Sequence, residues 1–130
     1  MKKYAAVTSG VSIPKLQELH DTRHQQVFPV VDEKTRIYLG YITYDDVTEY
    51  MKKYPECQNS PAVTSGNILI EVIPADATRP FIRAHLDESP EQALSKIRRY
   101  DLDFIPVVDH DEVYKGIIDK ESLLRLINQR

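Results

Sequence analysis

Cysteine is nearly absent from this chain of 130 residues, in which Cys57 is the only one. A single cysteine excludes an intrachain disulfide and any zinc site built from several cysteines. It suits a reducing compartment, so we expect a cytoplasmic protein. Cys57 lies in the loop-like sequence YPECQNS with no histidine or other base beside it, which argues against a catalytic nucleophile.

Long apolar runs and an excess of positive charge are also missing. The longest aliphatic run in the middle of the chain covers only residues 68–70, too short to span a bilayer. The basic N-terminal sequence MKKYAAVTSG lacks the apolar core of a secretion signal. Lysine and arginine number 17 against 20 acidic residues, a net charge of −3. This balance gives no electrostatic basis for binding nucleic acid or an anionic membrane.

Residue sets typical of catalysis are missing as well. The sequence has no glycine-rich phosphate loop, no Ser-His-Asp set and no paired carboxylates spaced for acid–base chemistry. His20 and His24 have helical spacing but lack the glutamate of the zinc-protease pattern. We expect all four histidines at the surface, and we predict a non-catalytic protein without a metal site or cofactor.

What the sequence does contain is a repeated phrase. FPVVD stands at residues 28–32 and IPVVD at residues 105–109, 77 positions later. Gly40 and Gly116 continue the pattern with an offset of 76 positions. A fixed period of this kind indicates two copies of one supersecondary unit. Either copy alone is too small to bury a sufficient core, so we expect the two to pack against each other.

Each copy has the pattern of a β-α-β-β-α unit, which predicts an α/β fold of two such units. The β-branched phrase predicts one strand, and the apolar residues around each glycine predict its hairpin partner. Helices are expected to follow at residues 43–54 and 119–129. Their predicted buried faces are formed by Val47, Tyr50 and Met51 in the first copy and by Leu123, Leu124, Leu126 and Ile127 in the second.

A further helix is expected before each phrase, over about residues 12–24 and 87–100. Ser12 and Ser89 are the expected N-caps, and Gln92 stands where it completes a capping box with Ser89. Short strands near residues 5–7 and 81–83 would precede these helices.

The unit boundaries are placed at residues 1–54 and 78–130. The connector, residues 55–77, contains three prolines and one alternating segment, ILIEVI. A second identity, AVTSG at residues 6–10 and 62–66, has an offset of 56 positions that does not match the main repeat. We interpret it as coincidence.

The two phrases and the residues after them resemble the CBS motif, named for cystathionine β-synthase. FPVVD…GYITYDDV and IPVVD…GIIDKESL share its hydrophobic-Pro-Val-Val-Asp strand and the glycine ahead of a helix. Two motifs in register over nearly the whole chain resemble the tandem pair called a Bateman module. The resemblance implies two units related by pseudo-twofold symmetry, clefts between them that hold adenine nucleotides such as AMP or ATP, and assembly into a homodimer.

In this family such pairs are regulatory parts of CLC-type chloride channels, other transporters and metabolic enzymes. Residues 66–80 form a full lead-in to the second unit, whereas only three residues precede Tyr4 in the first. This imbalance predicts a fragment of a longer protein, and residues 23–43 are most similar to transporter tails.

The stretch GYITYDDV carries the expected binding site. A helix beginning there points free N–H groups and its positive dipole end outward, which favours a phosphate. Thr43 would add a hydroxyl donor, and Asp46 would accept hydrogen bonds from ribose. The resemblance adds Val27, Ile42 and Tyr44 to the pocket. The same Thr-x-x-Asp spacing is also a capping box that needs no ligand, so both interpretations stay open.

The second copy departs from this pattern. Asp119 stands where the first copy has Thr43, and Ser122 where it has Asp46. The Asp119 charge opposes a phosphate, which Lys120 would offset only in part. We therefore expect one competent site rather than two, and we expect Arg83 to be a solvated surface residue.

The leading hypothesis is a regulatory module that senses AMP, ADP or ATP. The alternative is a ligand-free dimerisation module attached to a transporter or an enzyme.

Overall fold

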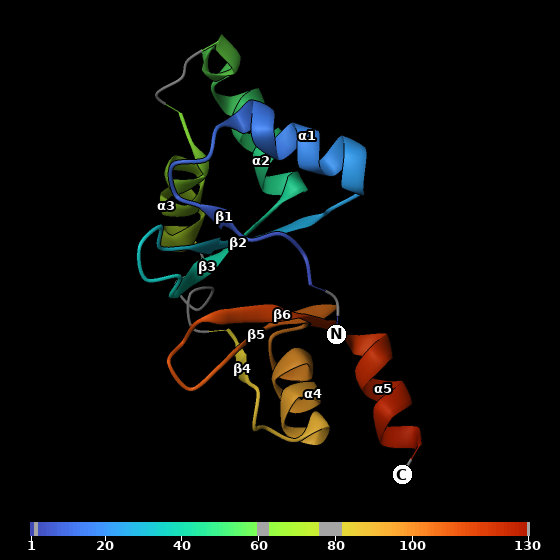
Figure 1. Ribbon diagram of the computed structural model, residues 1–130. Coiled ribbons are helices and arrows are strands. Elements are labelled where there is room, and N and C mark those ends of the chain that lie inside the picture. Colours follow the sequence, from blue (N-terminus) through green and yellow to red (C-terminus); the bar gives the residue numbers. More distant parts are fainter. Residues whose placement is uncertain (2, 60–62, 76–81, 130) are drawn as a thin grey trace.

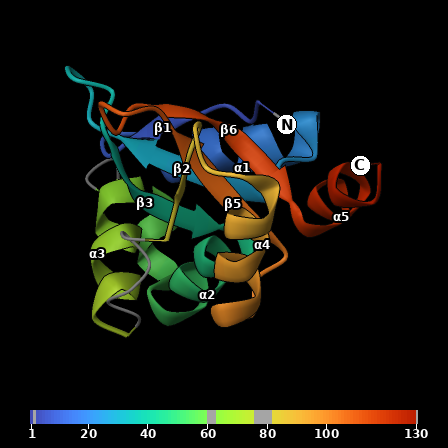
Figure 2. The same cartoon turned by 90° about the horizontal axis from the view of Figure 1, so that it is seen from below.

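The computed structural model of the chain describes residues 1, 3–59, 63–75 and 82–129. Two three-stranded sheets face each other and carry helices on their outer sides (Figure 1, Figure 2). The strand orders are β1-β2-β3 in one sheet and β4-β5-β6 in the other. The predicted α/β fold of two packed units is confirmed.

The first unit follows the predicted order of elements, which are β1 (Val7–Thr8), α1 (Ile13–Arg23), β2 (Val27–Val31), β3 (Tyr38–Thr43) and α2 (Tyr44–Lys53). β1 is parallel to β2, and β3 is antiparallel to it. The Ser12 side chain caps α1 by accepting a hydrogen bond from the Lys15 N–H. Leu16 and Leu19 on α1 and Val47 on α2 are buried, as their spacing predicts.

The second unit repeats this order with β4 (Ala84–His85), α4 (Pro90–Arg99), β5 (Phe104–Val108), β6 (Tyr114–Asp119) and α5 (Lys120–Asn128). Ser89 and Gln92 form the predicted capping box of α4. β4 lies slightly later than expected, and residue 81 is outside the described part of the chain. One prediction is wrong: Leu126 is 45% exposed, because nothing in the described structure covers that side of α5.

The backbone confirms the repeat in detail. Both sheets have the same irregularity in strand pairing, at the equivalent place in each middle strand. In the described part of the chain, four non-glycine residues adopt left-handed conformations, which are uncommon for such residues. They form two pairs at the repeat spacing, His24 with Asp101 and Arg36 with Glu112.

Equivalent residues of the two copies meet between the sheets. Val27 and Phe104 occupy matching positions, as do Tyr41 and Ile117, and the four side chains form one apolar cluster. The rings of Tyr41 and Phe104 contact edge to face with centroids 5.1 Å apart. The N–H of Tyr38 also donates to the carbonyl of Glu112 at 2.9 Å, so hydrogen bonding joins the units as well.

The connector forms η1 (Pro55–Asn59) and α3 (Ser65–Ala75) in its described part. The alternating segment ILIEVI therefore lies in a helix, although its β-branched residues favour a strand. Packing decides the outcome: Ile68 and Leu69 are 1% and 6% exposed and belong to the core of the first unit. α3 thus completes the first unit from outside the repeated pattern (Figure 1).

The two AVTSG segments adopt different structures but contact each other. The first includes β1 and a turn, and the second leads into α3. The Ser65 N–H donates to the carbonyl of Val11, and the Gly66 N–H donates to the carbonyl of Ser9, both at 2.8 Å. A Cβ atom at Gly66 would lie 2.8 Å from the Ser9 carbonyl oxygen, so glycine is needed here. Interpreting this identity as coincidence missed that the segments anchor α3.

Candidate functional site

The start of α2 is built by Thr43 and Asp46. The Thr43 hydroxyl accepts from the Asp46 N–H at 3.1 Å, and the Asp46 carboxylate accepts from the Thr43 N–H at 2.8 Å. These two bonds form a complete capping box. Both residues therefore have a structural role that needs no ligand, and any ligand contact comes in addition to it.

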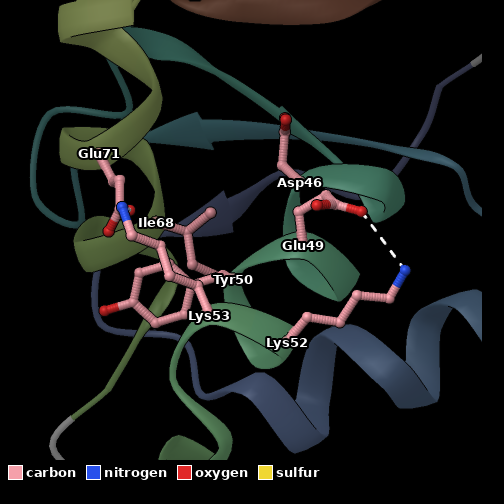
Figure 3. A pocket seen from close by; sticks show the side chains of 7 residues that line it. All are labelled: Asp46, Glu49, Tyr50, Lys52, Lys53, Ile68 and Glu71. Atoms are coloured by element: carbon pink, nitrogen blue, oxygen red, sulfur yellow. Dashed lines mark hydrogen bonds and ion pairs between the residues drawn. The ribbon is translucent and has the colours of Figure 1, made fainter.

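A groove runs from this helix start along α2. We call it the α2 groove; it is lined by Asp46, Glu49, Tyr50, Lys52, Lys53, Ile68 and Glu71 (Figure 3). The α2 residues follow helical spacing, and the last two residues belong to α3, which forms the opposite wall. Its volume of about 450 Å³ is within the range of small-molecule sites.

Ion pairs engage the lysines of the α2 groove. The Lys53 Nζ lies 2.5 Å from a carboxylate oxygen of Glu71, and the Lys52 Nζ lies 3.5 Å from a carboxylate oxygen of Glu49. The hydrogen bond that the Lys53 ammonium group donates to the Glu71 carboxylate raises the pKa of Lys53. Three carboxylates thus line the groove against two ammonium groups that already have partners. The first turn of α2 also carries Asp45 beside Asp46. Because these acids offset the positive helix end, phosphate is favoured less here than a bare helix start implies.

The other residues predicted for this pocket lie close by but differ in access. Val27 is the cross-strand partner of Thr43 and is 8% exposed. Ile42 is fully buried in the first core, so it offers no accessible surface to a ligand. The ring of Tyr44 stacks on the ring of His20, with centroids 3.6 Å apart.

The structure places Asp119 and Lys120 elsewhere, at the start of α5 in the second unit. Asp119 caps this helix by accepting from the Ser122 N–H at 2.7 Å. The two residues line a shallow pocket with Asp103, Glu121 and Leu124. Three carboxylates and one ammonium group surround this pocket, which makes it unsuited to a phosphate.

Arg83 is an ion-paired residue rather than the expected solvated one. Its guanidinium donates to the Glu112 carboxylate at 2.5 and 3.2 Å. This contact holds the pKa of Glu112 down at about 2. The His85 Nε2 lies 2.8 Å from a carboxylate oxygen of Glu112, and its Nδ1 lies 3.4 Å from one of Glu88. These two carboxylates raise the pKa of His85.

The expected surface position of all four histidines is therefore only partly correct. The His110 side chain is 90% exposed, whereas those of His85 and His20 are 32% and 26% exposed. Cys57 is buried, and burial raises the pKa of its thiol, which keeps it protonated. Among the described residues, no three His, Cys, Asp or Glu side chains gather as metal ligands, and no helix has the length and apolarity to cross a membrane.

Sequence reasoning missed most of the α2 groove. Glu49, Tyr50 and Lys53 lie three, four and seven positions after Asp46, so helical spacing alone would have identified them. Ile68 and Glu71 carried no such signal, because the segment that contains them was not recognised as a helix.

The model of the CBS domain matches residues 3–53 and 71–129. The chain belongs to the CBS domain family. The CBS domain pair of protein MJ0100, solved in complex with 5′-methylthioadenosine and S-adenosyl-L-methionine, is 25% identical, with a TM-score of 0.72. The match covers 99% of this chain and 91% of that one.

Two further relatives extend the comparison. CBSX2, solved in complex with AMP, has a TM-score of 0.71 over 97% of this chain and 88% of its own; at 17% identity it shows the fold alone. A homoserine O-acetyltransferase of Methanohalobium evestigatum is 26% identical over 125 residues, or 96% of this chain. The chain spans 22% of the length of that curated relative.

Proposed function

We propose that this CBS domain pair is a non-catalytic regulatory module that binds an adenosine-containing ligand in the α2 groove. The observation that carries the proposal is the position of Asp46 at the end of a groove large enough for a nucleoside. A ribose offers two neighbouring hydroxyl donors, and a carboxylate accepts such bonds strongly. Support also comes from the adenosine ligands of the 25% identical pair.

The charges of the groove set the expected order of ligands. Each phosphate adds negative charge next to three carboxylates whose neighbouring ammonium groups are already paired. We therefore expect AMP to bind more tightly than ADP, and ADP more tightly than ATP. S-adenosylmethionine, which carries a sulfonium cation, is expected to bind more tightly than any of them.

The regulated polypeptide is proposed to be an enzyme rather than a channel. This rests on the 26% identity to a homoserine O-acetyltransferase, of which the chain spans 22%. A ligand controls such a polypeptide only through different affinities for two poses of the module. The two poses would differ in how the units, or two copies in a homodimer, sit against each other.

A ligand-free dimerisation module is the second candidate. The observation that favours it is the capping box, which satisfies Thr43 and Asp46 without any ligand. Under that candidate the melting temperature would depend on protein concentration and not on nucleosides. The homodimer itself stays a prediction, to be checked by sedimentation equilibrium.

Thermal unfolding with a panel of ligands separates the two candidates. AMP, ADP, ATP, 5′-methylthioadenosine and S-adenosylmethionine would each be added to the purified chain in excess. A ligand that binds only the folded state raises the melting temperature by mass action. The proposal predicts an increase for at least one adenosine compound and none for the matching guanosine compound. No increase for any of them would contradict ligand binding and leave the dimerisation module.

A further inference from the structure

Two oppositely charged side chains meet across the α2 groove at the C-terminal end of α2. The Lys53 Nζ on α2 lies 2.5 Å from the Glu71 Oε1 on α3, and Figure 3 shows the lysine reaching from one wall to the other. Asp46 lines the same groove seven positions before Lys53, which corresponds to about 10.5 Å of helix rise. The groove thus has an acceptor for a ribose at the start of α2 and an ion pair at its end.

Both members of this ion pair are accessible from the groove. The Lys53 side chain is 63% exposed and that of Glu71 is 32% exposed. Among the described residues, only Lys53 donates a hydrogen bond to the Glu71 carboxylate, through the Oε1 atom, which leaves Oε2 as an acceptor within that part of the chain. Water screens a pair of this exposure, so it adds little to stability. Because Ile68 and Leu69 already hold α3 against the first core, the pair can admit a ligand group at little cost.

The repeat does not require a cation at position 53. Gln129 stands 76 positions later, at the equivalent place in the second copy, and it is neutral. A lysine late in a helix also favours the helix dipole, but Lys52 provides that charge in the same turn. The placement of Lys53 opposite Glu71 is therefore a feature of the α2 groove rather than of the fold.

An ammonium group beside a carboxylate is complementary to an α-amino acid group, which carries both charges at neutral pH. The ligand ammonium would donate to Glu71, and the ligand carboxylate would accept from Lys53. Both hydrogen bonds are charge-assisted and therefore stronger than neutral ones. A phosphate offers only the negative half and meets Glu71 as a like charge. The pair thus distinguishes a zwitterion from an anion.

We propose that the Lys53–Glu71 pair recognises an α-amino acid group joined to the 5′ carbon of the adenosine ligand. This inference rests on the proposed function, because Asp46 holds the ribose in both. From that ribose an extended amino acid tail follows α2 past Glu49 and Tyr50, which line the groove one turn later, and reaches the pair. The ligand class is then an adenosine with an amino acid tail rather than a nucleotide.

A purely structural ion pair is the alternative. If Lys53 and Glu71 only join α2 to α3, their loss alters the shape of the groove and changes the binding of every adenosine ligand alike. If they recognise the tail, their loss weakens the ligands that carry it more than those that lack it. The ratio of two affinities, one for a ligand with the tail and one for a ligand without it, therefore separates the two roles.

Two thioethers isolate the contribution of the tail. S-adenosylhomocysteine and 5′-methylthioadenosine share the adenosine and an uncharged sulfur, and only the first carries the amino acid group. Calorimetric titration of each compound into the full chain gives the ratio of their dissociation constants. We expect S-adenosylhomocysteine to bind wild type at least about tenfold more tightly than 5′-methylthioadenosine.

Glu71→Gln and Lys53→Met each remove one charge of the pair. We expect each substitution to reduce the ratio to below about threefold, whereas Lys53→Arg, which keeps the charge, should retain at least about fivefold. The matched control is Lys15→Met, which breaks an exposed ion pair with Glu18 on α1, outside the α2 groove, and should keep the wild-type ratio. Melting of each variant without ligand verifies that it is folded.

The outcomes separate this inference from the proposed function. Equal affinity of the two thioethers for wild type would overturn the inference alone and leave adenosine binding in place. No binding of either thioether would overturn the inference together with the proposed function. A tenfold ratio that Glu71→Gln and Lys53→Met leave unchanged would assign the tail to other residues and would also overturn it.

Discussion

α3 covers one side of the first unit, whereas the equivalent side of the second unit is open in the described part of the chain. Both have the same strands, the same two helices and the same left-handed residues at equivalent places. The first also receives α3, which brings Ile68 and Leu69 into its core, whereas Leu126 of the second lies 45% exposed. The two units thus share the backbone of the repeat, and in the described part of the chain they differ in the cover that α3 gives to the first.

The N-termini of α2 and α5 likewise share their backbone structure and differ in their side chains. Thr43 and Asp119 both cap a helix by accepting from the N–H three residues later. Only the first copy adds the carboxylate of Asp46, in place of which the second has Ser122. A cap tolerates several polar residues, but a ribose requires an acceptor with the right charge. Equivalent structure therefore does not imply equivalent binding.

The largest expected effect tests the cover of the first unit. Ile68→Ala removes a side chain that is 1% exposed, so we expect it to lower the free energy of unfolding by about 3 kcal/mol. Leu126→Ala on the open side should cost less than about 1 kcal/mol. Urea unfolding of both variants measures the difference. Equal losses would mean that something covers this side of α5 in solution.

A smaller effect tests how the units depend on each other. Phe104→Ala removes the ring that contacts Tyr41 between the sheets, and we expect a loss of about 2 kcal/mol. Tyr100→Ala, at an exposed helix end, should change stability by less than about 0.5 kcal/mol. Scanning calorimetry should show one transition for wild type, because neither unit is large enough to be stable alone. Two separate transitions would show that the units unfold independently, which contradicts this expectation.

The smallest effect concerns pH and is confined to the second unit. His85 corresponds to Thr8 of the first unit, which does not titrate. The carboxylates of Glu112 and Glu88 raise the pKa of His85, so the folded state favours its protonated form. The resulting stabilisation is present below a pH of about 6.5, the ordinary value, and is lost as pH rises through the raised pKa.

We therefore expect wild type to lose up to about 1 kcal/mol between about pH 6 and pH 9 through this group. The His85→Gln variant should lack this part of the loss, as measured by urea unfolding at both pH values. His110→Gln removes an exposed histidine and should keep the wild-type profile. A His85→Gln profile identical to wild type would show that the ion pairs of His85 do not couple to folding.

The repeated elements were predictable because their signals are local. Ser12, Ser89 and Gln92 are side-chain caps whose effect depends on neighbours three residues away. The buried positions Leu16, Ala93 and Ile97 follow from helical periodicity. Such features hold wherever the segment packs, so the sequence alone identifies them.

The parts that escaped prediction depend on contacts distant in sequence. α3 has strand-favouring residues and becomes a helix against the first unit, anchored by Gly66 on Ser9. Leu126 fits a buried periodic position but lies where none of the described residues covers it. Arg83 meets Glu112 across 29 positions, and no local pattern reveals that pair. Of the residues that line the α2 groove, the sequence pointed only to Asp46 at the start of α2, and the wall formed by α3 depends on the same distant contacts.

The central claim is that one adenosine ligand binds through Asp46 in the first unit and none through Ser122 in the second. Calorimetric titration of AMP and S-adenosylmethionine into wild type, Asp46→Ala and Ser122→Ala tests it most directly. Asp46 also caps α2, so its loss should destabilise the chain by about 1 kcal/mol, and melting without ligand must be measured beside the titration.

The account predicts one ligand per chain, an affinity about tenfold to a hundredfold lower in Asp46→Ala, and little change in Ser122→Ala. Two equal sites, or equal effects of the two substitutions on affinity, would contradict it.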